Sequence, residues 1–108
     1  MLTSTLNPQT QTPPKVTRIP EPEVELEPLV RVIIHNDDVT PMDFVVHVLE
    51  RIFFLSQPDA MGVMYAAHTS GMAYVQTLPR SEGQKRINTA HFAAGVEGYP
   101  LHFSLEDE

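Results

Sequence analysis

Apolar and polar positions follow two different periods along the chain from residue 29 onward, and these periods predict the secondary structure. Short runs rich in β-branched and aromatic residues predict three strands, at 29–35, 72–78 and 99–105. Apolar residues recur at helical spacing in three other segments, which predicts helices over 41–54, 56–70 and 79–95 or 79–98. The order β-α-α-β-α-β predicts an α+β sandwich with three helices packed on a small, three-stranded antiparallel sheet.

Local signals mark where these helices begin. We expect Thr40 to be the N-cap of the first helix and Pro41 its first residue, because proline loses no hydrogen bond there. Ser56 is the expected N-cap of the second helix, and Ser81 with Gln84 forms a weaker capping-box match in the third. The predicted inner face of the third helix consists of Ile87, Ala90, His91 and Ala94.

The composition changes at residue 29 and divides the chain into two parts. Residues 1–28 hold six of the ten prolines and an alternating series of glutamates, so they bury little apolar surface. Such a segment cannot offset the entropy lost on ordering, and we expect a disordered, Pro/Glu-rich tail. Residues 29–108 are expected to form a single folded domain.

The formal net charge of −7 and the absence of cysteine exclude several classes of function. No basic stripe is present, so binding to nucleic acid or to an anionic membrane is not expected. Without cysteine there is no disulfide framework and no thiolate metal site. No apolar run reaches membrane-spanning length and no signal peptide is visible, so we expect a cytoplasmic protein, and a monomer.

An acidic turn between the first strand and the first helix is the main candidate for a binding site. Asn36, Asp37 and Asp38 place several hydrogen-bond acceptors side by side, which suits an ammonium group with its three donors. The same residues could instead form an Asx turn that caps the helix. His68 could add one neutral acceptor, or could be an ordinary core histidine.

Enzymatic and metal chemistry find little support in the sequence. A zinc site can be drawn from His35, His68 and either Asp37 or Asp38, but no pair of histidines has metal-ligand spacing. No serine lies in a Gly-rich elbow, and there is no cysteine nucleophile or phosphate-binding loop. We therefore expect no catalytic activity and no cofactor.

The stretch from Val32 to Val46, Val-Ile-Ile-His-Asn-Asp-Asp-Val-Thr-Pro-Met-Asp-Phe-Val-Val, resembles the signature of the ClpS family. Members of this family are adaptors of bacterial Clp proteases and belong to the N-degron pathway. The resemblance covers about residues 29–106. His68 follows Asn36 at the family's usual distance, and residues 99–106 are similar to its last strand.

The resemblance implies recognition of a protein's free N-terminal residue when this residue is Leu, Phe, Tyr or Trp. By position, Asn36, Asp38 and His68 would bind the α-ammonium group, and Asp37 would add negative charge. Met42 would act as the gate that excludes β-branched residues. The side-chain pocket would be lined by Ile34, His35, Thr40, Met42, Val45, Met64, Ala67 and Leu101. Ala67 replaces a larger aliphatic residue, which would make the pocket roomier.

The resemblance also implies a partner. A Clp AAA+ unfoldase, ClpA-like or ClpC-like, would receive the substrate, and its N-terminal domain would hold the adaptor. Arg86 stands where the family often has a lysine that docks on this domain. The tail would enter the pore of the unfoldase during hand-over. The alternative is a ClpS-like protein that docks on the unfoldase mainly to inhibit or redirect it.

Overall fold

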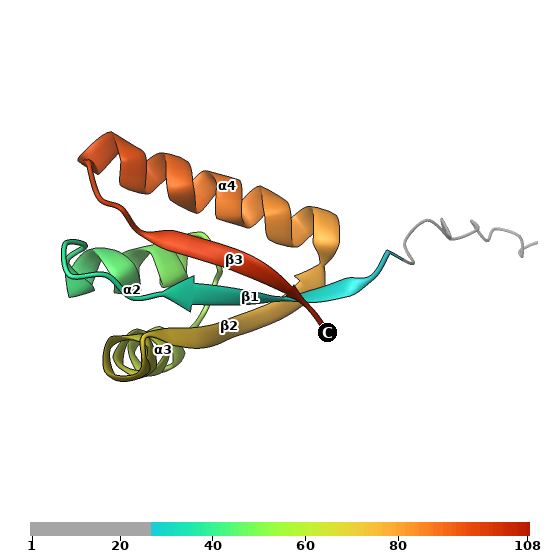
Figure 1. Ribbon diagram of the computed structural model, residues 1–108, viewed down its shortest axis with the longest axis horizontal. Coiled ribbons are helices and arrows are strands. Elements are labelled where there is room, and N and C mark those ends of the chain that lie inside the picture. Colours follow the sequence, from blue (N-terminus) through green and yellow to red (C-terminus); the bar gives the residue numbers. More distant parts are fainter. Residues whose placement is uncertain (1–26) are drawn as a thin grey trace, which may run out of the picture.

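The computed structural model describes residues 27–108, and the earlier part of the predicted tail lies outside this range. Figure 1 shows a twisted sheet with helices packed against it. Along the chain the elements are β1 (Leu29–His35), α2 (Met42–Arg51), α3 (Gln57–Ser70), β2 (Met72–Pro79), α4 (Arg80–Glu97) and β3 (His102–Asp107). The predicted order and the predicted α+β class are confirmed.

The sheet has the strand order β2-β1-β3, so the first strand is central and both neighbours are antiparallel to it (Figure 1). The register of β1 against β2 shifts between Val32 and Ile33. On the other side, His35 is paired with His102 and Ile34 with Phe103. The end of β1 therefore lies beside the start of β3, although these residues are far apart in the sequence.

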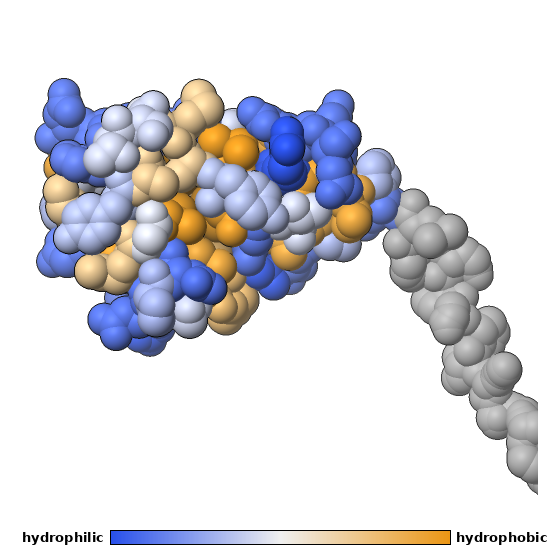
Figure 2. Space-filling model, turned by 90° about the horizontal axis from the view of Figure 1, so that it is seen from below, coloured by the Kyte–Doolittle hydropathy of each residue, from blue (hydrophilic) through white to orange (hydrophobic). Residues whose placement is uncertain are grey.

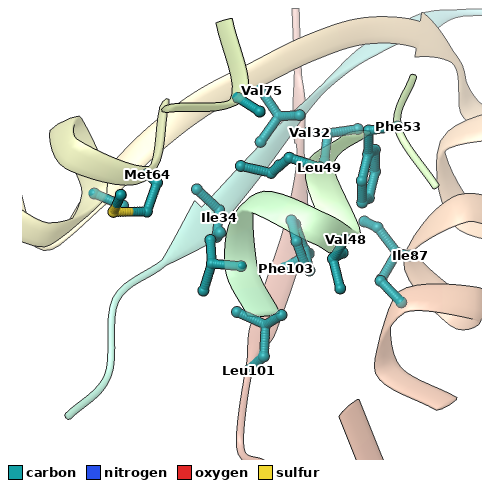
Figure 3. Packing of buried hydrophobic residues seen from close by; sticks show 14 of the residues in the cluster. Val32, Ile34, Val48, Leu49, Phe53, Met64, Val75, Ile87, Leu101 and Phe103 are labelled. Carbon is teal, nitrogen blue, oxygen red and sulfur yellow. The ribbon is translucent and has the colours of Figure 1, made fainter. Parts of the chain in front are cut away.

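One buried cluster joins the sheet to all three helices. From the sheet it takes alternate residues such as Val32 and Ile34 of β1 and Phe103 of β3, as the two-residue period of a strand requires. The ring of Phe53 stacks on that of Phe103 at a centroid distance of 4.8 Å. Figure 3 shows Leu49 of α2 and its neighbours filling the space between the helices and the sheet.

Several predicted boundaries were wrong by a few residues. The first helix ends at Arg51 rather than Phe54, because the chain turns there and Phe54 takes the left-handed backbone conformation with φ of 59°. The last strand begins at His102 rather than Tyr99 and continues to Asp107. Arg80 donates to Asp107 over 2.7 Å, which holds the end of this strand to the start of α4.

The predicted cap of the second helix is confirmed, whereas the capping box of the third is wrong. Ser56 accepts from the backbone N–H of Asp59 over 3.2 Å. At the start of α4, Ser81 donates from its N–H and from its hydroxyl to the carboxylate of Glu27, over 2.7 and 2.8 Å. Gln84 donates to Asn88 instead of closing a capping box. Those hydrogen bonds to Ser81 lower the pKa of Glu27.

The surface of the described residues is a mixture of polar and apolar side chains. Apolar side chains reach it between polar ones on the face that Figure 2 shows. None of the helices in residues 27–108 combines the length and the apolar character needed to span a membrane.

Candidate binding site

A pocket of about 320 Å³ opens at the end of the sheet where β1 stops. It lies between the turn after β1, the helices α2 and α3, and the segment that leads into β3. It is lined by Ile34, His35, Asn36, Asp37, Asp38, Val39, Thr40, Pro41, Met42, Val45, Met64, Ala67, His68 and Leu101. All residues predicted for the amine site and for the side-chain pocket are in this list. Val39 and Pro41 also line the pocket and were not predicted, because only the path of the folded turn brings them there.

The inner wall of the pocket is apolar and buried. Ile34, Met64, Ala67 and Leu101 are each 5 % exposed or less. Ile34 lies between Met64 and Leu101 in Figure 3, so β1, α3 and the segment before β3 each supply one side of the wall. Met42 is 43 % exposed and belongs to the rim. A bulky apolar side chain can be removed from water by this wall.

The turn after β1 is organised by the carboxylate of Asp37. Oδ1 accepts from the N–H groups of Val39 and Thr40 over 2.8 and 2.7 Å, and Oδ2 accepts from the Thr40 hydroxyl over 2.9 Å. Partial burial by itself raises the pKa of Asp37, but the hydrogen bonds from Thr40 and Val39 outweigh it, and the pKa is lower than usual. Asp37 is thus a charged group committed to the turn.

Thr40 is not the N-cap that the sequence predicted. Its hydroxyl donates to Asp37, and Pro41 takes the N-cap position without a side-chain cap. The N–H groups of Phe44 and Val45 both donate to the carbonyl oxygen of Pro41 over 3.1 Å. The prediction fails because the helix begins one residue later than expected, at Met42, so the N-cap position falls on Pro41.

Asn36, Asp38 and His68 lie on the exposed side of the pocket. Within residues 27–108, none of these three side chains makes a hydrogen bond to another protein group, so their acceptors face solvent. The N–H of Asn36 donates to the carbonyl oxygen of Gly71 over 2.9 Å, which ties the turn to the end of α3 near His68. No Lys or Arg of the described part of the chain lines the pocket. The rim is therefore a set of free acceptors with negative charge.

The zinc site considered from the sequence is not assembled. Among residues 27–108, no three His, Asp or Glu side chains are placed to hold a metal ion. His35 instead hydrogen-bonds through Nε2 to the hydroxyl of Ser104 over 2.7 Å.

Arg86 lies outside the pocket, on α4. Its guanidinium donates to Glu82 over 2.8 Å and to Gln76 over 3.2 Å, and it lies 4.9 Å from the ring centroid of Phe54. It lines a separate surface hollow together with Arg51 and Lys85.

The fold and the pocket together define a small α+β binding domain with an apolar pocket and an acceptor-rich rim. The comparisons with known proteins give the family. The sequence model described as ATP-dependent Clp protease adaptor protein ClpS matches residues 25–104. The chain belongs to the ClpS family, the adaptors of ATP-dependent Clp proteases, as its sequence indicated.

Individual relatives agree with this assignment. The ATP-dependent Clp protease adapter protein ClpS of Desulfatibacillum aliphaticivorans is 36 % identical over 89 residues, which cover 82 % of this chain and 86 % of the relative. The adapter protein ClpS 2 of Mesorhizobium japonicum is 37 % identical, over 88 % of this chain and 98 % of the relative. The solved structure of Agrobacterium tumefaciens ClpS2 bound to L-phenylalaninamide superposes with a TM-score of 0.72. It is 34 % identical and covers 75 % of this chain and 98 % of that chain.

Proposed function

We propose that this chain binds proteins through a free N-terminal residue that is large and apolar, and delivers them to a Clp AAA+ unfoldase for ATP-dependent degradation. The observation that carries the proposal is the composition of one pocket, whose buried wall is apolar and whose rim holds acceptors that have no partner among residues 27–108. A free N-terminal residue has the matching chemistry, because its apolar side chain and its ammonium group are both bonded to the α-carbon.

The rim recognises the ammonium group in this proposal. Asn36, Asp38 and His68 accept its hydrogen bonds, and the fixed charge of Asp37 adds a favourable field from within the turn. An internal residue of a protein has an amide N–H in this place and leaves most of these acceptors without a partner. The rim therefore selects N-termini over the rest of a polypeptide.

The apolar wall selects the side chain. Burial of Leu, Phe, Tyr or Trp against Ile34, Met64 and Leu101 contributes ~1.5–3 kcal/mol, and each charge-assisted hydrogen bond contributes ~1.5–3 kcal/mol. The costs of association consume much of this sum, so we expect a roughly micromolar dissociation constant. In this proposal Met42, which lies at the rim, contacts the substrate close to its α-carbon and disfavours β-branched residues there.

The ligand in the Agrobacterium tumefaciens ClpS2 structure supports this choice of substrate. L-Phenylalaninamide has a free α-amine and an aromatic side chain, which are the two groups that the proposal requires.

Binding to peptides tests the first half of the proposal. Fluorescence anisotropy is measured with peptides that begin with Leu, Phe, Tyr, Trp, Ile or Met, each with a free and with an acetylated N-terminus. We expect the free Leu and aromatic peptides to bind and their acetylated forms to lose at least about tenfold in affinity, the value of one charge-assisted hydrogen bond. Equal binding of free and acetylated peptides would contradict the amine site.

Variants of single acidic residues refine this test. Asp38→Asn removes a rim charge and should weaken the binding of free peptides. Asp43→Asn is the matched control, because Asp43 is an exposed acid in the first turn of α2 that does not line the pocket. An equal effect of both variants would point to net charge rather than to a specific contact.

Delivery to the unfoldase is the second half of the proposal. We expect the tail to enter the pore and the face around Arg86 to dock on the N-terminal domain of the unfoldase, as the resemblance implies. The test compares degradation of a Leu-initiated reporter with the full chain and with a chain lacking residues 1–26. This truncation keeps Glu27, which caps α4, so the folded part stays intact. Lost delivery with unchanged peptide binding supports the role of the tail.

The second candidate is an adaptor that mainly inhibits or redirects the unfoldase. The favouring observation is the hollow around Arg86, with Arg51 and Lys85 beside it, which is separate from the pocket and offers a surface that needs no substrate. This candidate predicts that the full chain slows degradation of an unrelated unfoldase substrate while the Leu-initiated reporter is not degraded faster.

A further inference from the structure

The imidazole of His91 holds the edge of the sheet next to the pocket. His91 lies on α4, and its Nε2 accepts a hydrogen bond from the backbone N–H of Phe103 on β3 over 2.9 Å. A backbone N–H can only donate, so this nitrogen has to be unprotonated. Because this N–H donates to a side chain of α4, it is directed away from the strand ladder, and Phe103 is only 1 % exposed. A buried N–H in this position needs a side-chain partner.

Leu101 lies between two attachments to the C-terminal half of α4. Before it, the N–H of Tyr99 donates to the carbonyl oxygen of Ala94 over 2.9 Å. After it, Phe103 donates to His91. Leu101 itself precedes β3 and is not part of the strand ladder. The place of this wall of the pocket therefore depends on both attachments, and one of them requires a neutral imidazole.

Two further imidazoles continue from His91 to the rim of the pocket. The ring of His102 on β3 stacks on His91 with a centroid distance of 5.4 Å and an interplanar angle of 13°. The ring of His35 at the end of β1 lies 5.0 Å from that of His102, and His35 lines the pocket. A proton on any of the three repels a proton on its neighbour.

Among the described residues 27–108, no ion pair with a carboxylate neutralises a charge on these rings. The strands β1, β2 and β3 pack against α4, and α2 meets it where Arg51 and Lys85 line one hollow. His102 of β3 faces His91, His35 of β1 follows behind it, and Ser104 is a neutral partner of His35. Strand β2 contains no Asp or Glu. Within residues 27–108, no carboxylate, including those of α2 and β3, approaches His91 within ion-pair distance. One turn away on α4 the residues are uncharged. Burial, and next the charge of His102, lower the pKa of His91 below 6.5.

We propose that His91 is a positioning residue for the substrate pocket: its neutral imidazole fixes Leu101, and protonation of His91 releases this wall and weakens peptide binding. A proton on Nε2 turns the acceptor into a donor that faces the donor of Phe103. The buried N–H of Phe103 then loses its hydrogen-bond partner, which costs free energy. This cost favours a displacement of the start of β3 that exposes the N–H to water. The inference rests on the proposed function, since it deepens the same pocket.

Peptide binding across pH tests the inference. Affinity of a free Leu-initiated peptide is measured by anisotropy from about pH 8 down to about pH 5, the range in which histidine titrates. The wild type is compared with His91→Gln, whose side-chain carbonyl oxygen can accept from Phe103 and does not titrate. All other histidines are the same in both proteins, so the difference between their profiles reports His91. The control is His47→Gln, an exposed histidine of α2 outside the pocket.

On acidification we expect the wild type to lose at least about fivefold more affinity than His91→Gln. About fivefold is the lower end of the usual range for the effect of one site on the affinity of another. His47→Gln should follow the wild type. Superimposable profiles of the wild type and His91→Gln would overturn the inference.

A second readout separates this result from the proposed function. Wild-type NMR spectra follow the Leu101 methyl groups and the Phe103 amide during titration without peptide. Both should shift with the same midpoint as the His91 ring, below pH 6.5. If no free peptide binds at any pH, the proposed function fails, and this titration alone decides the inference. Signals of Leu101 and Phe103 that do not move with the ring would refute the positioning role.

Discussion

Asp37 and Asp38 are neighbours in the sequence with opposite expected roles, and substitution separates them. Asp37 accepts three hydrogen bonds inside the turn, whereas the side chain of Asp38 is exposed and, among residues 27–108, has no protein donor. We therefore predict that Asp37→Ala lowers stability and that Asp38→Ala lowers affinity for free N-terminal peptides. Asp37→Asn is the conservative variant, because its amide oxygen can still accept from both N–H groups.

The magnitude follows from the hydrogen bonds of Asp37. The three bonds have lengths of 2.7–2.9 Å and lie in a turn that is partly open to water. Water replaces some of them in the variant, so each contributes in the lower half of the usual net range, ~0.5–1 kcal/mol. Asp37→Ala should cost about 2 kcal/mol, or about 10 °C in Tm for a domain of this size. Asp38→Ala should stay within about 0.5 kcal/mol of the wild type, as exposed substitutions usually do.

The assay is urea unfolding followed by circular dichroism, together with anisotropy on the same protein samples. For Asp38→Ala we expect at least about a tenfold loss of affinity, the value of one charge-assisted hydrogen bond to the ammonium group. Asp37→Ala with wild-type stability would refute the structural role of this carboxylate. Equal loss of stability in both variants would refute the division of roles between the two residues.

The dependence on pH gives the same prediction a second check. Because the pKa of Asp37 is lowered from 3.8, the folded state binds its proton less readily than the unfolded state. The stability from Asp37 is therefore present above about pH 4 and is lost as the pH falls through the lowered pKa. The difference in unfolding free energy between the wild type and Asp37→Asn should shrink over this acidic range.

Three further predictions concern α4 and the pocket wall. Gly95→Ala should raise the unfolding free energy by about 1 kcal/mol, since nothing lies within 4 Å of the added carbon. Gly83→Ala places the added carbon 3.1 Å from a Leu105 methyl group and should stabilise less. Urea midpoints that rank the two variants the other way would contradict this prediction. Ala67→Val should weaken binding of Trp-initiated peptides more than Leu-initiated ones in anisotropy, because Ala67 is a buried wall residue, and an equal loss would show that it does not set the pocket size. Glu27→Ala should speed hydrogen exchange at the amide of Ser81 and leave α3 unchanged, and unchanged exchange at Ser81 would refute the capping role of Glu27.

The periodicity of the sequence was sufficient for the order of the elements, because burial of one face imposes a period of two on strands and 3.6 on helices. The periodicity was not sufficient to predict where each helix and strand ends. Residues 52–54 keep the apolar character of the first helix, yet Ile52 closes it and Phe54 reverses the chain with a positive φ. The ring of Phe53 stacks on that of Phe103 of β3, and this contact depends on the packed sheet.

The pocket could be assembled from the sequence only through the resemblance. Neither spacing nor period relates Asn36 to His68 or Leu101, and these residues line one pocket because β1 pairs with β3 and because Gly71 holds the turn. Local reasoning gave Asp37 two readings, a ligand for a cation or an Asx turn. The hydrogen bonds of Asp37 agree with the second reading, and its charge can still act on a bound cation through space.

The remaining wrong or incomplete predictions have a common cause, which is that the polar partners are distant in the sequence. Ser81 was expected to close a cap with Gln84, but Glu27 is bound there by contacts across 54 residues. His91 was expected only as part of the inner face of α4, but its ring serves the edge of β3. A periodic pattern indicates which face of an element is buried, and it is silent on which donor or acceptor that face must satisfy. Side chains whose acceptors are already used inside the fold, such as Asp37, stabilise it. Those at the edge of an apolar pocket that have no partner among residues 27–108, such as Asp38, are the ones available to a ligand.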